Sequence, residues 1–193
     1  DDKIKAALIL DDLGVHYIEG GWPLSNPKDN EFFQEIQNYE LKNAKIAAFG
    51  STAHPKSKNV KDDKNLQELI KSKAPVLTIF GKTWDFHVSQ ALGISNTANL
   101  QLIKDSVAYL KSAGREVIFD AEHFFDGYLA NPEYALETLK AAEAGGADSI
   151  SLCETNGGKL PHQIFEIVKV VKREIKIPIG IHCHNDSGCA VAN

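Results

Sequence analysis

The sequence has no methionine among its 193 residues and only three cysteines. The sequence does not begin with an initiator methionine. Its first residues follow a helical pattern that places apolar side chains on one side, namely Ile4, Ala7, Leu8 and Leu13. We therefore expect a segment before residue 1. Residues 190–193 resemble the start of a further helix, so we also expect a segment after them. On this interpretation, residues 1–193 form a single partial domain.

Further absences narrow the class of protein. There is no apolar run long enough to cross a membrane and no signal peptide. The formal charge of −5 is not offset by a basic block, which argues against nucleic acid or a membrane surface as the main partner. Cys153, Cys183 and Cys189 are odd in number and lie close to polar motifs, so we expect reduced thiols. Together these features predict a cytoplasmic protein.

Short β-rich runs alternate with amphipathic segments along the whole chain. The predicted strands are residues 15–19, 46–49, 76–80, 117–121, 149–153 and 177–181. The predicted helices are residues 30–37, 65–71, 98–111, 132–144 and 161–173. Regular alternation predicts right-handed βα crossovers and therefore a parallel sheet with helices outside. The fold class is α/β, either a barrel or a doubly wound sheet.

Polar motifs follow nearly every predicted strand. Glu19, Glu122, Thr155 and His182 each stand at or just after the end of one. A barrel places its active-site residues at the carboxyl ends of many strands, whereas a doubly wound sheet gathers them at a switch point. We therefore predict a parallel (β/α)8 TIM barrel. Six strands do not close it, so the first strand and the last βα unit are expected outside these residues.

His182 and His184 are two residues apart at the end of the last predicted strand. Alternate side chains of a strand share a face, so both imidazoles point the same way and Cys183 the opposite way. Two imidazoles on one face can hold one divalent metal, although a complete site needs a third ligand. The alternative is that one histidine packs and the other caps a helix.

Asp120 and Glu122 show the same spacing, so both carboxylates are expected to face the barrel interior. Inward carboxylates repel each other unless a cation or a proton lies between them. A metal on the histidine pair would supply that cation, and Glu122 could then orient substrate or transfer a proton. Alternatively, Asp120 binds backbone groups and Glu122 pairs with a lysine.

Three further residues are candidates for substrate contact. Thr155 opens a glycine-rich turn whose hydroxyl and N–H groups could bind a carboxylate, unless the turn is only a connection. Glu19 brings a carboxylate to the rim, where Trp22 is expected to cover the barrel end. His87 either reaches the pocket or stacks against Phe86.

Residues 181–193, with the sequence IHCHNDSGCAVAN, resemble the H-x-H-N-D-x-G-x-A-V-A-N segment of the isopropylmalate/homocitrate synthase family of metal-dependent barrel enzymes. Residues 16–23, 25–29, 80–87 and 120–127 resemble the citramalate synthase branch of that family. The resemblance covers essentially the whole chain, and the H-x-H segment is highly specific.

The resemblance implies condensation of acetyl-CoA with a 2-oxo acid, pyruvate in this branch, to give (R)-citramalate and CoA in branched-chain amino-acid biosynthesis. It implies a divalent metal (magnesium, manganese or zinc) on His182 and His184. Thr155 resembles the hydroxyl residue that binds the keto-acid carboxylate, and Glu122 the acidic residue at the end of the fifth barrel strand. The full-length protein is expected to be a homodimer.

The sequence departs from the family at several points. The Asp-Arg-Glu triplet of the first strand and the asparagine ligand beyond the H-x-H motif have no counterpart, and Glu154 stands where relatives commonly have aspartate. We therefore expect this chain alone to bind metal weakly and not to turn over. The competing interpretations are an isopropylmalate or homocitrate synthase, a carbon–carbon lyase of the same superfamily, and a catalytically silent metal-binding fragment.

Overall fold

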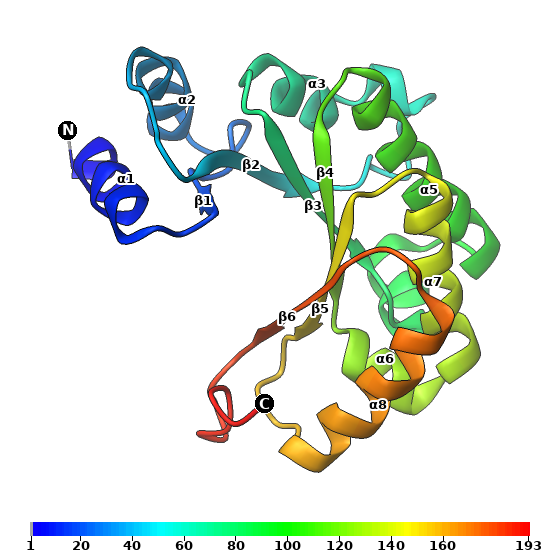
Figure 1. The fold of residues 1–193 in the computed structure, drawn as a ribbon. Coiled ribbons are helices and arrows are strands. Elements are labelled where there is room, and N and C mark those ends of the chain that lie inside the picture. Colours follow the sequence, from blue (N-terminus) through cyan, green and yellow to red (C-terminus); the bar gives the residue numbers. More distant parts are fainter. Residues whose placement is uncertain (1) are drawn as a thin grey trace.

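The computed structural model describes residues 2–193 and contains one sheet of six parallel strands. The strands lie side by side in the order of the chain, and the sheet curls so that its first and last strands border an open side (Figure 1). Their bounds are β1 Tyr17–Glu19, β2 Lys45–Ser51, β3 Val76–Lys82, β4 Glu116–Glu122, β5 Ser149–Glu154 and β6 Ile179–Cys183. All six predicted strands are confirmed.

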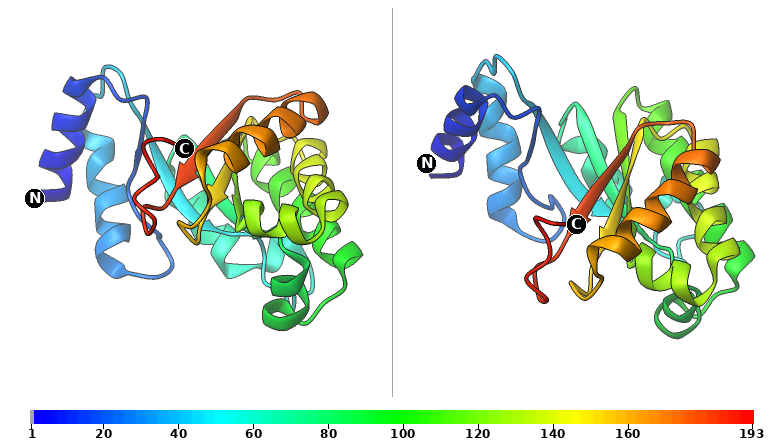
Figure 2. Two further views of the ribbon diagram at one scale, coloured as in Figure 1. Left: turned by 90° about the horizontal axis from the view of Figure 1, so that it is seen from below. Right: turned by 60° about the horizontal axis from the view of Figure 1, so that its bottom comes forward.

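Most of the helices cover the convex side of the sheet, as the crossover rule requires (Figures 1 and 2). The α-helices are α1 Asp2–Leu13, α2 Pro27–Glu35, α3 Lys64–Lys71, α4 Asp85–His87, α5 Asn96–Ser112, α6 Phe124–Ala130, α7 Pro132–Ala144 and α8 Pro161–Glu174. Short turns of other helix types are η1 Ile36–Asn38, η2 Val60–Asp62 and the π-turn η3 Val88–Leu92. The architecture is an incomplete (β/α)8 barrel, as predicted.

The hydrophobic core lies between the convex face of the sheet and the helices. Alternate strand residues point there and are fully buried, among them Leu77, Ile79, Phe119 and Leu152. The residues between them point to the concave face, which in a closed barrel is the interior. This alternation directs residues such as Leu77 and Ile79 to the helices and leaves Thr78, Asp120 and Ser151, together with the apolar Ile118, on the concave side.

Local differences from the predicted elements have clear causes. Helix α2 begins at Pro27 because the Asn26 side chain accepts a hydrogen bond from the Lys28 N–H (2.9 Å) and caps it. Helix α6 was not predicted, since it follows β4 after a single residue. Residues 190–193, expected to begin a helix, form a turn in which the Asn193 N–H donates to the Cys189 carbonyl (2.8 Å).

None of the helices within residues 2–193 combines the length and the apolar character that a membrane crossing requires.

Candidate functional site

The carboxyl end of β4 carries Glu122, whose partner is Lys82 at the end of β3. The two residues are aligned in the strand register and form an ion pair, with about a quarter of each side chain exposed. The backbone carbonyl of Glu122 also accepts a hydrogen bond from the Thr83 hydroxyl (2.7 Å). Of the two alternatives for balancing the charge of Glu122, the ion pair with a lysine is the one that the structure shows.

Thr155 follows β5 and holds the backbone just after Glu122. Its hydroxyl oxygen accepts a hydrogen bond from the His123 N–H (2.9 Å). His123 has a φ of 55°, a left-handed conformation that is uncommon for a residue with a side chain. Asp126 fixes the same region, since it lies 3.3 Å from the His123 ring and 2.6 Å from the Lys159 ammonium.

The loop after β5 packs directly on the loop that holds the histidine motif. Gly157 has a φ of 66°, and a methyl group on it would meet the Asp186 Cβ at 2.8 Å. The Ser187 N–H donates to the Gly157 carbonyl (2.9 Å), and the His184 N–H donates to the Glu154 carbonyl (3.1 Å). The conformation of the glycine-rich loop therefore sets the position of the histidine loop.

His182 and His184 lie on the same side of the chain, as the strand spacing predicts. Their ring centroids are 5.1 Å apart, and both residues are exposed at the open side of the sheet. Two neighbouring imidazoles with free access to solvent fit the family's divalent metal as two of its ligands.

The concave face below the histidines holds further donor groups. One carboxylate oxygen of Asp120, the Cys153 sulfur and a ring nitrogen of His182 lie within 4.8 Å of one another. Burial, and secondly the charge of Glu19, raise the pKa of Asp120 to about 7. Burial also raises the pKa of Glu19, while the Thr78 hydroxyl lowers it. Glu19 is exposed and lines the same hollow of the concave face as Asp120 and His182.

His87 packs within an aromatic cluster above the strand ends. Its ring centroid is 4.6 Å from that of His123 and 4.8 Å from that of Trp84, both closer than Phe86 at 5.8 Å. Burial, and then His123, lower the pKa of His87, and its Nδ1 is buried without a hydrogen-bond partner. The ring of His87 thus packs edge-on to His123 and tilted against Trp84 rather than stacking on Phe86.

Trp22 closes the other side of the strand ends. Its ring lies edge-on to Phe49 and Phe80 at 5.9 Å from each, and its Nε1–H donates to the Asn65 side chain (2.7 Å). These contacts agree with the expected covering role.

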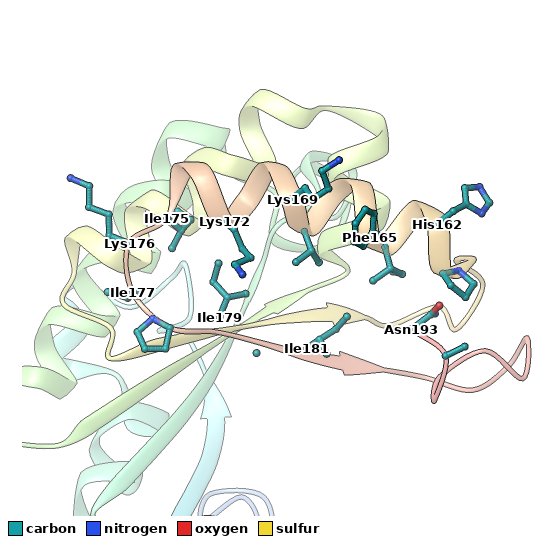
Figure 3. Close-up of a pocket in the computed structure, with 16 residues that line it drawn as sticks. His162, Phe165, Lys169, Lys172, Ile175, Lys176, Ile177, Ile179, Ile181 and Asn193 are labelled. Carbon is teal, nitrogen blue, oxygen red and sulfur yellow. The ribbon is translucent and has the colours of Figure 1, made fainter.

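A larger hollow lies elsewhere, between α8 and the free edge of β6 (Figure 3). Its walls are mainly apolar, with Phe165, Ile179 and Ile181 among the lining residues. None of the six site residues predicted from the sequence lines it. The chemistry-bearing groups instead gather on the concave face and at the carboxyl ends of the strands.

A curled parallel sheet with polar residues at the carboxyl ends of its strands is the arrangement found in β/α-barrel enzymes. The chain belongs to the HMGL-like family, whose model matches residues 1–193. It is 58% identical to the (R)-citramalate synthase of Aquifex aeolicus over all of this chain and 37% of that protein. It is 33% identical to the 2-isopropylmalate synthase of Methanocaldococcus jannaschii over all of this chain and 35% of that protein.

Among solved structures, the HMG-CoA lyase of Bacillus subtilis superposes with a TM-score of 0.80 at 20% identity, covering 100% of this chain and 64% of the other. This likeness supports the fold. The chain spans little more than a third of the length of the curated relatives it matches.

Lys82, His123 and Cys153 did not emerge from the sequence as site residues. Lys82 stands in the quoted segment 80–87 at the end of a predicted strand, so its position was a usable signal. The left-handed backbone of His123 and the closeness of Cys153 to Asp120 and His182 depend on contacts between loops and strands. Only the structure reveals them.

Proposed function

We propose that the full-length protein containing this chain condenses acetyl-CoA with a 2-oxo acid, pyruvate, to give (R)-citramalate and free CoA. The observation that carries the proposal is the similarity to (R)-citramalate synthases, which extends over the whole chain. The similarity to a 2-isopropylmalate synthase is much lower, which favours pyruvate over the larger 2-oxo acid of that enzyme.

In this proposal, the acetyl methyl group loses a proton and its carbon bonds to the keto carbon of pyruvate. Water then cleaves the thioester, which releases CoA and leaves the second carboxylate of the product. His182 and His184 would hold the metal, which when bound would polarise the keto group. The remaining ligands are expected from chain outside residues 1–193, in line with the family pattern.

The chain's own residues supply binding and orientation around that centre. The Thr155 hydroxyl, next to the left-handed His123, would bind the keto-acid carboxylate. Glu122, held by Lys82, would orient the substrate or accept a proton. Glu19 and His87 would line the substrate-binding space. Closing the barrel over this face would exclude water and strengthen each of these polar interactions.

The setting of the enzyme follows from the proposed reaction. We propose that it acts in the cytoplasm, in the branch of amino-acid biosynthesis that leads to isoleucine, and as a homodimer. Size measurement of the full-length protein in solution tests the last point, and a monomer at working concentrations contradicts it.

The test is metal-dependent release of the CoA thiol by the full-length protein, with pyruvate, 2-oxoisovalerate and 2-oxoglutarate offered separately. We expect release with pyruvate, its loss in His182→Ala and His184→Ala, and its retention in His162→Ala, an exposed histidine on α8. Preference for another acid would keep the chemistry and change the substrate. Absence of release with all three acids, in protein that binds metal, contradicts the condensation and favours a lyase or a silent metal-binding protein.

A further inference from the structure

The concave face carries a second set of metal-ligand types, deeper in the barrel than the histidine pair. Asp120, Cys153 and His182 come from three adjacent strands, β4, β5 and β6. Cys153 is aligned with His182 in the strand register, and Asp120 is aligned with Ser151, two residues before Cys153. Their ligand atoms lie within 4.8 Å of one another, whereas His184 is not part of this group.

The chemistry of this group differs from that of the His182–His184 pair. A thiolate is a soft ligand that selects zinc-like metals, while magnesium and manganese prefer carboxylate and water. Cysteine sulfur, imidazole nitrogen and carboxylate oxygen are each ligands that zinc takes in proteins. The three donors thus favour a thiophilic cation over the hard cations that an oxygen-rich site takes.

The surroundings leave these donors available. Cys153 is only 7% exposed, and its sulfur makes a single weak contact, to the Ser151 carbonyl at 3.7 Å. Within residues 2–193, Asp120 takes part in no ion pair. The thiol is buried beside a carboxylate and an imidazole, and none of the three groups has a stronger partner. A bound cation would therefore give all three a partner.

We propose that Asp120, Cys153 and His182 bind a thiophilic divalent cation of the zinc type, as an alternative to the metal of the histidine pair. The Cys153 thiol gives its proton to solvent, and the thiolate donates an electron pair to the cation. His182 is common to both sets, so a cation in the deeper site takes this imidazole away from His184. The two metals therefore compete, and this site does not depend on the reaction proposed above.

The other cysteines provide matched controls. Cys183 is adjacent to His182 in sequence but points to the opposite face of β6, where Glu154 is a neighbour that raises its pKa after burial. Cys189 lies in the loop that follows. A metal bound through Cys153 is therefore distinguishable from one bound through either of the other thiols.

The experiment is titration of the metal-free full-length protein with Co²⁺, with the near-ultraviolet absorption that a cobalt–thiolate bond produces as the readout. We expect this absorption in the wild type, in Cys183→Ser and in His184→Ala, and its loss in Cys153→Ser. Zinc added afterwards is expected to displace cobalt and remove the absorption. Cobalt that binds without this absorption, or absorption that persists in Cys153→Ser, overturns the proposal.

A second variant covers the case in which Cys153→Ser folds poorly. Asp120→Asn keeps the thiol and is expected to weaken Co²⁺ binding by about tenfold or more, since a ligand is lost. Unchanged affinity in this variant overturns the three-ligand site. Because the readout is spectroscopic, its failure is distinct from a failure to release CoA.

Discussion

Strand β4 carries a glutamate at each end, and each glutamate pairs with a lysine from a neighbouring part of the sheet. At the amino end, Glu116 accepts hydrogen bonds from the Lys45 ammonium (2.6 Å) and the Tyr17 hydroxyl (2.5 Å). At the carboxyl end, Glu122 pairs with Lys82. The two ion pairs are similar in chemistry, but the residues around them differ.

At the amino end, the Glu116 carboxylate is satisfied by Lys45 and Tyr17, with Asp148 nearby. The carboxyl-end pair adjoins the left-handed His123, which is bound to Thr155 at the start of the glycine-rich loop, and the two imidazoles lie at the same end of the sheet, on β6. In a barrel, the amino end of the strands serves stability, while the carboxyl end carries catalysis. The same ion pair is therefore expected to contribute to stability at one end and to activity at the other.

The largest difference between the two ends is expected from one substitution made at both. Glu122→Gln is expected to lower kcat about 100-fold or more, since it removes the charge that proton transfer or orientation needs. Glu116→Gln is expected to leave kcat unchanged and to lower the free energy of unfolding by about 1 kcal/mol. CoA release and urea unfolding of the full-length protein measure the two effects. Equal losses of kcat in both variants would contradict the division between the ends.

Thr155 tests whether the carboxyl end binds the 2-oxo acid. Thr155→Val is expected to raise the KM for pyruvate about 10-fold to 100-fold, because a lost hydrogen bond to a charged group is worth about 1–3 kcal/mol. Thr155→Ser, which keeps the hydroxyl, is expected to restore most of the affinity. A Thr155→Val enzyme with normal KM would restrict this residue to holding His123 in place.

Two glycines with left-handed backbones allow the two ends of the strands to be compared by the same substitution. Gly157 (φ 66°) lies at the carboxyl end against Asp186, whereas Gly114 (φ 74°) precedes β4 and has open space around it. Alanine at either position costs about 1 kcal/mol for the left-handed backbone. Only Gly157→Ala also displaces the histidine loop, so only this variant is expected to lose activity several-fold. Similar activity in the two variants would show that the contact with Asp186 does not matter.

The smallest effect is a pH dependence that belongs to the amino end. Burial raises the pKa of Glu116, but hydrogen bonds from Lys45 and Tyr17 outweigh it, so the pKa lies below 4.5. A lowered carboxylate pKa gives stability that is present above the unfolded value and lost as the pH falls through the folded value. Below about pH 4.5, the stabilities of the wild type and Glu116→Gln should therefore converge. Unfolding curves at pH 3 to 7 check this, and a constant difference would contradict it.

The sequence predicted most of the strands and helices and part of the candidate site. Alternation and spacing located all six strands, and the His182–His184 spacing placed both imidazoles on one side. Helix α6 was missed, because its seven residues carry too little periodicity to stand out. The sequence left the partner of Glu122 open between a lysine and a metal, because the pairing with Lys82 depends on the register of β3 against β4.

The local sequence by itself determined which residues form strands, which side of each strand a residue takes and which polar motifs follow the strand ends. These properties depend on backbone periodicity and on neighbours in the chain. The tertiary structure alone decided that Lys82 meets Glu122, that Gly157 supports the histidine loop, and that Asp120 and Cys153 reach His182. Such contacts join residues tens of positions apart, and they arise only when the register and curl of the sheet bring neighbouring strand ends together.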